Sequence, residues 1–119
     1  MHKVTKILVT GGAGFCGAAI CKALQARGDA PVAMVLDGDP AVARFSQTLP
    51  DVPLVKANML DKEQVENVFS VHRPDVVVHC AAVVGVLVSL ENPAGVFQAN
   101  VEGSTNLMQS MIRHDVSRM

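Results

Sequence analysis

Aromatic side chains are scarce in this chain of 119 residues, which contains four phenylalanines and neither tyrosine nor tryptophan. Without tyrosine, these residues alone cannot support a mechanism that uses a phenolate as the proton acceptor. Neither sign of charge is in excess, since the formal net charge is −1, and binding to nucleic acid or to an anionic membrane is not expected. Asp, Pro or Gly interrupts every apolar run before it reaches the roughly 18 residues of a membrane-spanning helix.

Cysteine and histidine are also few. The three cysteines, an odd number with no C-x-x-C pair, are Cys16, Cys21 and Cys80. They are expected to be buried small apolar residues in a reducing compartment. The four histidines show no metal-ligand spacing, so no metal site is expected. The first residues lead directly into an apolar segment and resemble neither a signal nor a transit peptide, which favours a cytoplasmic location.

A glycine loop, Thr10–Gly17, directly follows the apolar run Ile7–Val9. A buried strand that breaks into glycines and then into a helix brings backbone N–H groups and a positive helix end to one point, where phosphate binds. We expect Gly11 to form the tight turn, Gly14 to allow close approach of a pyrophosphate, and Gly17 to allow close helix–strand contact. The following helix is expected to pack on the sheet through a stripe of four residues, Cys16, Ile20, Ala23 and Leu24.

Asp37 ends the next apolar segment, roughly 20 residues beyond Gly17, the spacing at which an acidic residue accepts hydrogen bonds from the adenosine ribose of NAD. A carboxylate at this place would repel the 2′-phosphate of NADP. No Arg or Lys is expected beside it, Arg44 being the nearest, so NAD is favoured over NADP. Asp39 is better explained by an ordinary Gly-Asp-Pro turn.

Strands and helices are expected to alternate in four units, with no repeat or linker that would mark a second domain within residues 1–119. The expected strands are Lys6–Thr10, Pro31–Asp37, Pro53–Ala57 and Val76–Cys80. The expected helices follow the glycine loop and cover Ala41–Leu49, Lys62–His72 and Pro93–Arg113, the last with an inward stripe of Phe97, Val101, Met108, Met111 and Ile112. This order predicts an α/β fold, a Rossmann-type doubly wound parallel sheet truncated after about four strand–helix units.

The motifs together resemble the extended short-chain dehydrogenase/reductase family, in its NAD-dependent epimerase/dehydratase branch of UDP-glucose 4-epimerase-like enzymes. The resemblance rests on the glycine loop, Asp37, the pair Asn58-Met59, and two longer segments, Pro74–Ala82 and Asn92–Leu107. It spans essentially the whole chain and implies NAD as the cofactor. It is less specific for the substrate.

The resemblance also implies a role for individual residues. It places Gly11, Gly14, Phe15, Cys16 and Gly17 at the pyrophosphate, Asp37 at the ribose, Asn58 and Met59 at the adenine, and Ala81 and Ala82 where the backbone passes close to the cofactor. Asn58 departs from the family's usual Asp, although its amide oxygen can still accept from the adenine amino group. Asn100 matches the residue that opens its helix locally and orders a proton-relay water. Residues 83–89 match a loop that leans toward the substrate.

The catalytic Tyr-x-x-x-Lys pair of the family has no counterpart here, which leaves it uncertain whether this chain is itself an enzyme. We expect it to be the N-terminal part of a nucleotide-sugar epimerase or dehydratase that is a homodimer when complete. A dehydrogenase of the same family that acts on a sterol or small carbonyl compound is an alternative, as is a non-catalytic NAD-binding module. With no fifth strand beside it, the fourth strand is expected to have an open edge, and the isolated chain is expected to self-associate through it.

Overall fold

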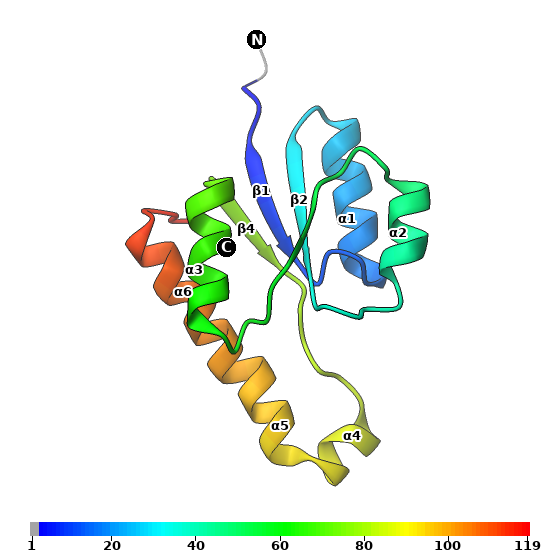
Figure 1. The fold of residues 1–119 in the computed structure, drawn as a ribbon, viewed down its shortest axis with the longest axis vertical. Helices are drawn as coiled ribbons and strands as arrows, with labels where there is room; N and C mark the ends of the chain where they lie inside the picture. The colour runs from blue at the N-terminus through cyan, green and yellow to red at the C-terminus, as the bar shows by residue number, and fades with distance from the viewer. Residues whose placement is uncertain (1–2) are drawn as a thin grey trace.

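The computed structural model describes residues 3–119 as a parallel sheet with helices on both faces (Figure 1). Its strands are β1 (Lys6–Thr10), β2 (Ala30–Val35), β3 (Leu54–Lys56) and β4 (Val76–His79). They lie in the order β3-β2-β1-β4, so the chain winds outward from β1 in one direction and then returns to its other side. The predicted fold class is therefore confirmed.

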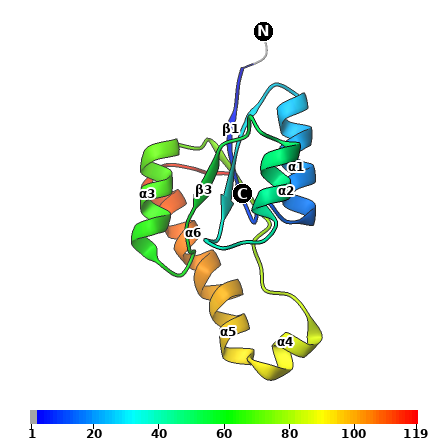
Figure 2. The same cartoon turned by 45° about the vertical axis from the view of Figure 1, so that its right-hand side comes forward.

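The helices before β4 are α1 (Phe15–Ala26), α2 (Val42–Thr48) and α3 (Lys62–His72), and those after it are α4 (Val86–Glu91), α5 (Pro93–Phe97), the π-helix η1 (Gln98–Glu102) and α6 (Gly103–Arg113). The views in Figures 1 and 2 agree that α4 and α5 extend beyond the carboxyl ends of the strands. No helix within residues 3–119 has both the length and the apolar character needed to cross a membrane.

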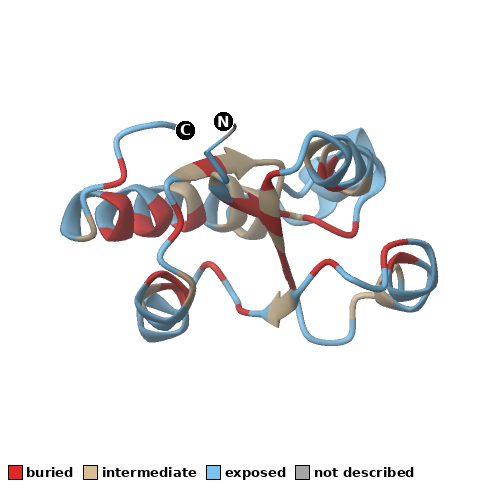
Figure 3. Ribbon diagram, turned by 90° about the horizontal axis from the view of Figure 1, so that it is seen from above, coloured by how far each residue is buried: buried red, intermediate tan, exposed pale blue. Residues whose placement is uncertain are grey.

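Two apolar cores cover the two faces of the sheet, and β1 contributes to both. Ile7 and Val9 pack in the core beneath α1 and α2, whereas Leu8 packs in the core beneath α3 and α6. Figure 3 shows buried residues along the central strands and on the helix sides that face them. Because both faces are covered, the strands are apolar throughout instead of alternating with polar residues.

The packing face of α1 differs from the predicted stripe. Gly17 and Cys21 are its buried residues, and Ile20 and Leu24 pack partly against the same core. Two of the predicted stripe residues, Cys16 and Ala23, are exposed. The prediction is therefore correct for Ile20 and Leu24, whereas Gly17 and Cys21 take the buried positions expected of Cys16 and Ala23.

The predicted helix Pro93–Arg113 is interrupted. The N–H of Gly103 donates to the Gln98 carbonyl five residues earlier, the spacing of a π turn. The buried face of α6 consists of Gly103, Asn106, Leu107, Ser110 and Met111. Of the predicted inward stripe only Met111 is buried, and its other members, Phe97, Val101, Met108 and Ile112, are exposed.

α4 was not predicted from the sequence; it begins inside the expected loop 83–89 and continues to Glu91. The edge of β4 was expected to be open. The backbone after α6 lies beside this edge, because the Val77 N–H donates to the Arg118 carbonyl at 3.0 Å. The open edge is therefore partly covered, in contrast to the expectation.

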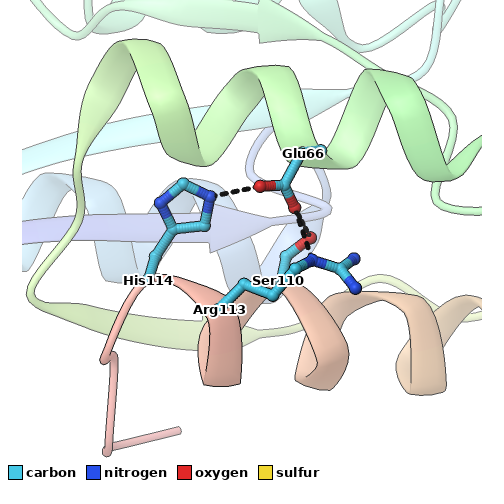
Figure 4. Close-up of polar contacts among 4 residues, drawn as sticks. All are labelled: Glu66, Ser110, Arg113 and His114. Carbon is cyan, nitrogen blue, oxygen red and sulfur yellow. Dashed lines mark hydrogen bonds and ion pairs between the residues drawn. The ribbon is translucent and has the colours of Figure 1, made fainter.

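A polar cluster lies between α3 and the C-terminal end of α6 (Figure 4). Glu66 Oε2 accepts from Ser110 Oγ at 2.9 Å and from Arg113 Nε at 3.1 Å, and its Oε1 lies 2.5 Å from His114 Nε2. Hydrogen bonds from His114, Ser110 and Arg113 lower the pKa of Glu66 from 4.5 to about 2. The ionised carboxylate therefore holds the two helices together.

Candidate functional site

A cavity of about 450 Å³ opens at the carboxyl ends of the four strands, a size suited to a small-molecule ligand. In a doubly wound sheet, ligands bind at this edge, near the point where the strand order reverses. Here that point lies between β1 and β4. Six of the predicted site residues line the cavity: Gly11, Gly14, Asn58, Met59, Ala81 and Ala82.

The glycine loop is shaped by contacts that exclude side chains. Gly11 has φ +60°, and a Cβ on it would lie 2.9 Å from the backbone of Ala81. A Cβ on Gly17 would overlap the Gly11 carbonyl oxygen, so Gly17 packs against the loop as well as against the sheet. A Cβ on Gly12, which the sequence analysis did not single out, would lie 2.5 Å from that of Ala33. Gly14 is less crowded, because a Cβ on it would lie 3.2 Å from the Gly11 carbonyl oxygen.

The N-terminus of α1 faces this loop without a side-chain cap. Gly14 occupies the cap position, and in this fully described helix the first turn contains no acidic residue. By contrast, Asp61 caps α3 and Asn92 caps α5 through their side-chain oxygens. The first N–H groups of a helix have no partner within the helix, so those of α1 are positioned to bind an anion.

Phe15 and Cys16 supply the first of these N–H groups, and both side chains are exposed, Phe15 to 93%. The expectation of three buried cysteines is therefore wrong for Cys16, and Cys80 is only partly buried. Cys21 is buried, which raises the pKa of its thiol to about 11, and burial also raises the pKa of Cys80. Residues 3–119 contain no group of three or more His, Cys, Asp or Glu side chains that could hold a metal ion.

Asp37 lies just beyond the end of β2, which stops at Val35, and its side chain is 87% exposed. Its Oδ1 lies 3.2 Å from the Lys56 Nζ at the end of β3. The expectation that no basic residue sits beside Asp37 is therefore wrong, because adjacent parallel strands bring distant residues together at their carboxyl ends. Asp39 accepts from the Ala41 N–H at 2.9 Å, as the turn interpretation predicted.

Asn58 and Met59 follow β3 and line the cavity floor. The Asn58 Oδ1 already accepts from the Leu60 N–H at 2.9 Å, which leaves one lone pair for a ligand. Asn106, buried on α6, donates to the Met59 carbonyl at 2.8 Å, and Gly103 lets the Met59 side chain pack against the helix. No role was predicted for Asn106, which belongs to the Asn92–Leu107 segment of the family resemblance.

Asn100 lies in the middle of η1, so the helix opens at the residue that the resemblance indicated. Its side chain accepts from the Val83 N–H at 2.8 Å and donates to the Val83 carbonyl at 2.9 Å. The hydroxyls of Ser104 and Thr105 donate to the carbonyls of Asn100 and Val101, four residues earlier, at 2.6 and 2.8 Å. Such bonds replace backbone pairing and favour irregular helix geometry.

The profile of the NAD dependent epimerase/dehydratase family matches residues 7–119, and the chain belongs to this family. It is 34% identical over 111 residues to UDP-glucose 4-epimerase of Erwinia amylovora, covering 88% of this chain and 32% of the relative. It is 30% identical over 109 residues to UDP-N-acetyl-alpha-D-glucosaminuronate decarboxylase of Bacillus cytotoxicus, covering 91% of this chain and 33% of the relative.

Solved structures agree with this assignment. The NAD complex of UDP-glucose 4-epimerase from Thermus thermophilus superposes with a TM-score of 0.82 at 36% identity, over 94% of this chain and 35% of that one. The UDP-glucose 4-epimerase from Bifidobacterium longum in complex with NAD+ and UDP gives a TM-score of 0.84 at 28% identity, over 94% of this chain and 35% of that one. The chain thus spans about a third of the length of these relatives and corresponds to their N-terminal part.

Proposed function

We propose that this chain is the NAD-binding N-terminal part of a nucleotide-sugar epimerase or dehydratase similar to UDP-glucose 4-epimerase. The observation that carries the proposal is the uncapped N-terminus of α1, which faces the glycine loop at the mouth of the 450 Å³ cavity. An anion seated there would be held by backbone N–H groups and by the helix dipole. The family and the NAD-containing structures of similar proteins support the dinucleotide as that anion.

The cofactor contacts follow from the positions of the residues around the cavity. Gly11 and Gly14 leave space for the pyrophosphate, the backbone of Phe15 and Cys16 binds it, and Gly17 lets α1 approach. Asp37 accepts from the adenosine ribose, with Lys56 at its side. The remaining lone pair of Asn58 Oδ1 accepts from the adenine amino group, beside Met59. Ala81 and Ala82 admit the cofactor past β4 because their side chains are small.

Asn100 has a positioning role in this proposal. Its side chain holds the loop at Val83, which lines the cavity, and its carbonyl accepts from Ser104. The local opening of the helix at η1 supports the family-like role of this backbone in ordering a proton-relay water. NAD, when bound in the complete enzyme, would accept a hydride from the sugar and return it.

The absence of tyrosine favours a second candidate for these 119 residues, an NAD-binding module without chemistry of its own. Both candidates predict NAD binding and differ only in turnover.

The first candidate also includes a nucleotide-sugar substrate, a homodimeric partner and a cytoplasmic location. The UDP sugars named in the structures of similar epimerases support the substrate class, and the three free cysteines are in keeping with a reducing compartment.

Titration calorimetry of the purified chain with NAD tests the proposal directly. We expect saturable binding of one NAD per chain. ADP-ribose should bind as well, because the glycine loop, Asp37 and Asn58 all lie at the adenosine diphosphate half. Nicotinamide mononucleotide, which lacks that half, is the matched control and should bind far more weakly. Absence of NAD binding by a chain that is folded by circular dichroism would refute the proposal.

A further inference from the structure

A continuous chain of hydrogen bonds runs from the glycine loop to the π-helix. Thr10 Oγ1 lies 2.6 Å from His79 Nδ1, and His79 Nε2 lies 2.8 Å from Ser104 Oγ. Ser104 Oγ in turn lies 2.6 Å from the Asn100 carbonyl oxygen. The ends of β1 and β4 are thus joined through side chains to the helix that carries Asn100.

The direction of every bond in this chain follows from the available protons. The Asn100 carbonyl can only accept, so the single hydroxyl proton of Ser104 points to it. Ser104 Oγ must therefore accept from His79, and the proton of the neutral ring lies on Nε2. His79 Nδ1 is then the acceptor, and Thr10 donates its hydroxyl proton to it.

The Thr10 hydroxyl completes the arrangement at the cavity wall. Its oxygen accepts from the N–H groups of Cys80 and Ala81, both at 3.1 Å. Thr10 is fully buried, so each of these bonds is made without competition from water. A proton on His79 Nδ1 would face an oxygen that already accepts twice and would leave the Thr10 hydroxyl proton without an acceptor. Burial also lowers the pKa of His79, in agreement with a neutral ring.

We infer that His79 and Ser104 are positioning residues that set the register of the π turn at Asn100 against the backbone of Ala81 and Gly11. The register of the π turn affects the cavity through Ala81. The backbone of Ala81 lies against Gly11, and Ala81 lines the cavity. A shift of the helix at Asn100 is transmitted through Ser104, His79 and Thr10 to the wall on which the glycine loop rests. The consequence for the cofactor rests on the proposed function, whereas the hydrogen-bond chain does not.

The protonation pattern is tested first, on the NAD-free protein. Long-range proton–nitrogen NMR spectra distinguish the two imidazole nitrogens of each histidine. We expect His79 to be neutral near pH 7 with its proton on Nε2 alone. A proton on Nδ1, or averaging between the two tautomers, would overturn the inference without requiring any variant.

The coupling is tested with hydroxyl variants of α6. Ser104→Ala breaks the chain, Ser104→Thr keeps the hydroxyl, and Thr105→Val removes a neighbouring hydroxyl that donates to Val101 and is not part of the chain. We expect Ser104→Ala to speed hydrogen exchange at the Ala81 amide and to weaken NAD binding by about tenfold, within the usual range for coupled sites. Ser104→Thr and Thr105→Val should leave Ala81 exchange unchanged.

The two readouts separate this inference from the proposed function. Unchanged Ala81 exchange in folded Ser104→Ala, or equal acceleration in Thr105→Val, would overturn the inference. Faster Ala81 exchange in Ser104→Ala alone, in a protein that binds no NAD, would support the positioning role and refute the proposed function instead.

Discussion

Asp37 and Lys56 form an exposed ion pair at the end of the sheet where the proposed cofactor's ribose would lie. Exposed pairs contribute little to stability, so both side chains remain available to a ligand. The carboxylate suits the two ribose hydroxyls of NAD, whereas the ammonium group would attract a 2′-phosphate. Cofactor preference is therefore a balance between two neighbouring residues.

We predict that Asp37→Ala weakens NAD binding by about 1 to 3 kcal/mol, the range for loss of charge-assisted hydrogen bonds. NAD should bind the unmodified chain more tightly than NADP, and Lys56→Ala should widen that difference because it removes the cation nearest to the 2′-phosphate. Calorimetry with both dinucleotides measures these effects, and Asp51→Ala, an exposed Asp before β3, is the matched control. Equal affinity of the unmodified chain for NAD and NADP would contradict the prediction.

Gly14 and Gly17 separate binding from folding. Gly14 has φ −69°, and a Cβ on it would meet only one atom closely, the Gly11 carbonyl oxygen at 3.2 Å, so Gly14→Val should keep the fold after a small shift and abolish NAD binding by blocking the pyrophosphate. Gly17→Ala should instead destabilise the fold by about 1 to 3 kcal/mol, because its Cβ would overlap the Gly11 carbonyl. Chemical denaturation and NAD titration of both variants measure this. Unchanged NAD affinity in Gly14→Val would show that the loop is only a turn.

At the scale of elements, α3 and α6 are joined by the Glu66 cluster of Figure 4. The pKa of Glu66 is lower in the folded chain, about 2, than its ordinary 4.5, so the folded state favours the ionised carboxylate. The cluster's stabilisation is therefore fully present above about pH 4.5 and is lost as the pH falls through 2.

We predict that Glu66→Gln is less stable than the unmodified chain at pH 6 and that this difference shrinks steadily between pH 4.5 and pH 2. Denaturant unfolding over this pH range measures the effect. Glu102→Gln, on an exposed residue outside the cluster, is the control and should show no such convergence. A Glu66→Gln difference that stays constant down to pH 2 would contradict the assigned role.

The helix after β4 illustrates how local chemistry changes an element. Ser104 and Thr105 bond back to the carbonyls of Asn100 and Val101, and the helix opens into η1 at that place. The apolar pattern of Pro93–Arg113 predicted one regular helix, which is correct for its extent and wrong for its interior. Apolar residues occur on both faces of this helix, so their spacing could not show which face is buried. The predicted stripe fell mainly on the exposed face.

For the whole molecule, exposed apolar side chains are the main feature outside the cavity. Val84, Val86, Leu87 and Leu90 are each exposed by more than 70%, and Ile112 on α6 by 76%. Contiguous exposed apolar residues mark interaction surfaces or association-prone regions. They lie on α4 and the residues before it and on the exposed side of α6.

We predict that the isolated chain self-associates through these residues. Sedimentation velocity should detect species larger than the monomer of 12.6 kDa. Leu87→Lys and Ile112→Lys, made separately, should reduce association and identify the responsible helix, with Gln109→Lys on the exposed face of α6 as the control. A monodisperse monomer throughout the sedimentation experiment would contradict the prediction.

We also predict that the isolated chain is catalytically silent. With no tyrosine to act as proton acceptor, interconversion of UDP-glucose and UDP-galactose in the presence of NAD should not exceed background. A coupled assay with a complete UDP-glucose 4-epimerase as positive control measures this. Turnover that persists after removal of contaminating enzyme would show that these residues contain another proton acceptor.

The sequence by itself determined the element order and the glycine loop. β1 and α3 match their predicted bounds, since strand propensity, helix capping and glycine geometry act between residues close together along the chain. The tight turn expected at Gly11 is present, with a positive φ, whereas the place of Gly14 at the cap of α1 was not predicted. Asn100 was located through the family resemblance.

Only the tertiary structure decided which of these residues meet. The Lys56 partner of Asp37, the outer position of Phe97 and Ile112, and the contact of Asn106 with Met59 depend on how helices and strands pack. The bond between Thr10 and His79 joins residues 69 positions apart. Such contacts arise when parallel strands end at one edge of a sheet, and no local pattern along the chain specifies the distances between them.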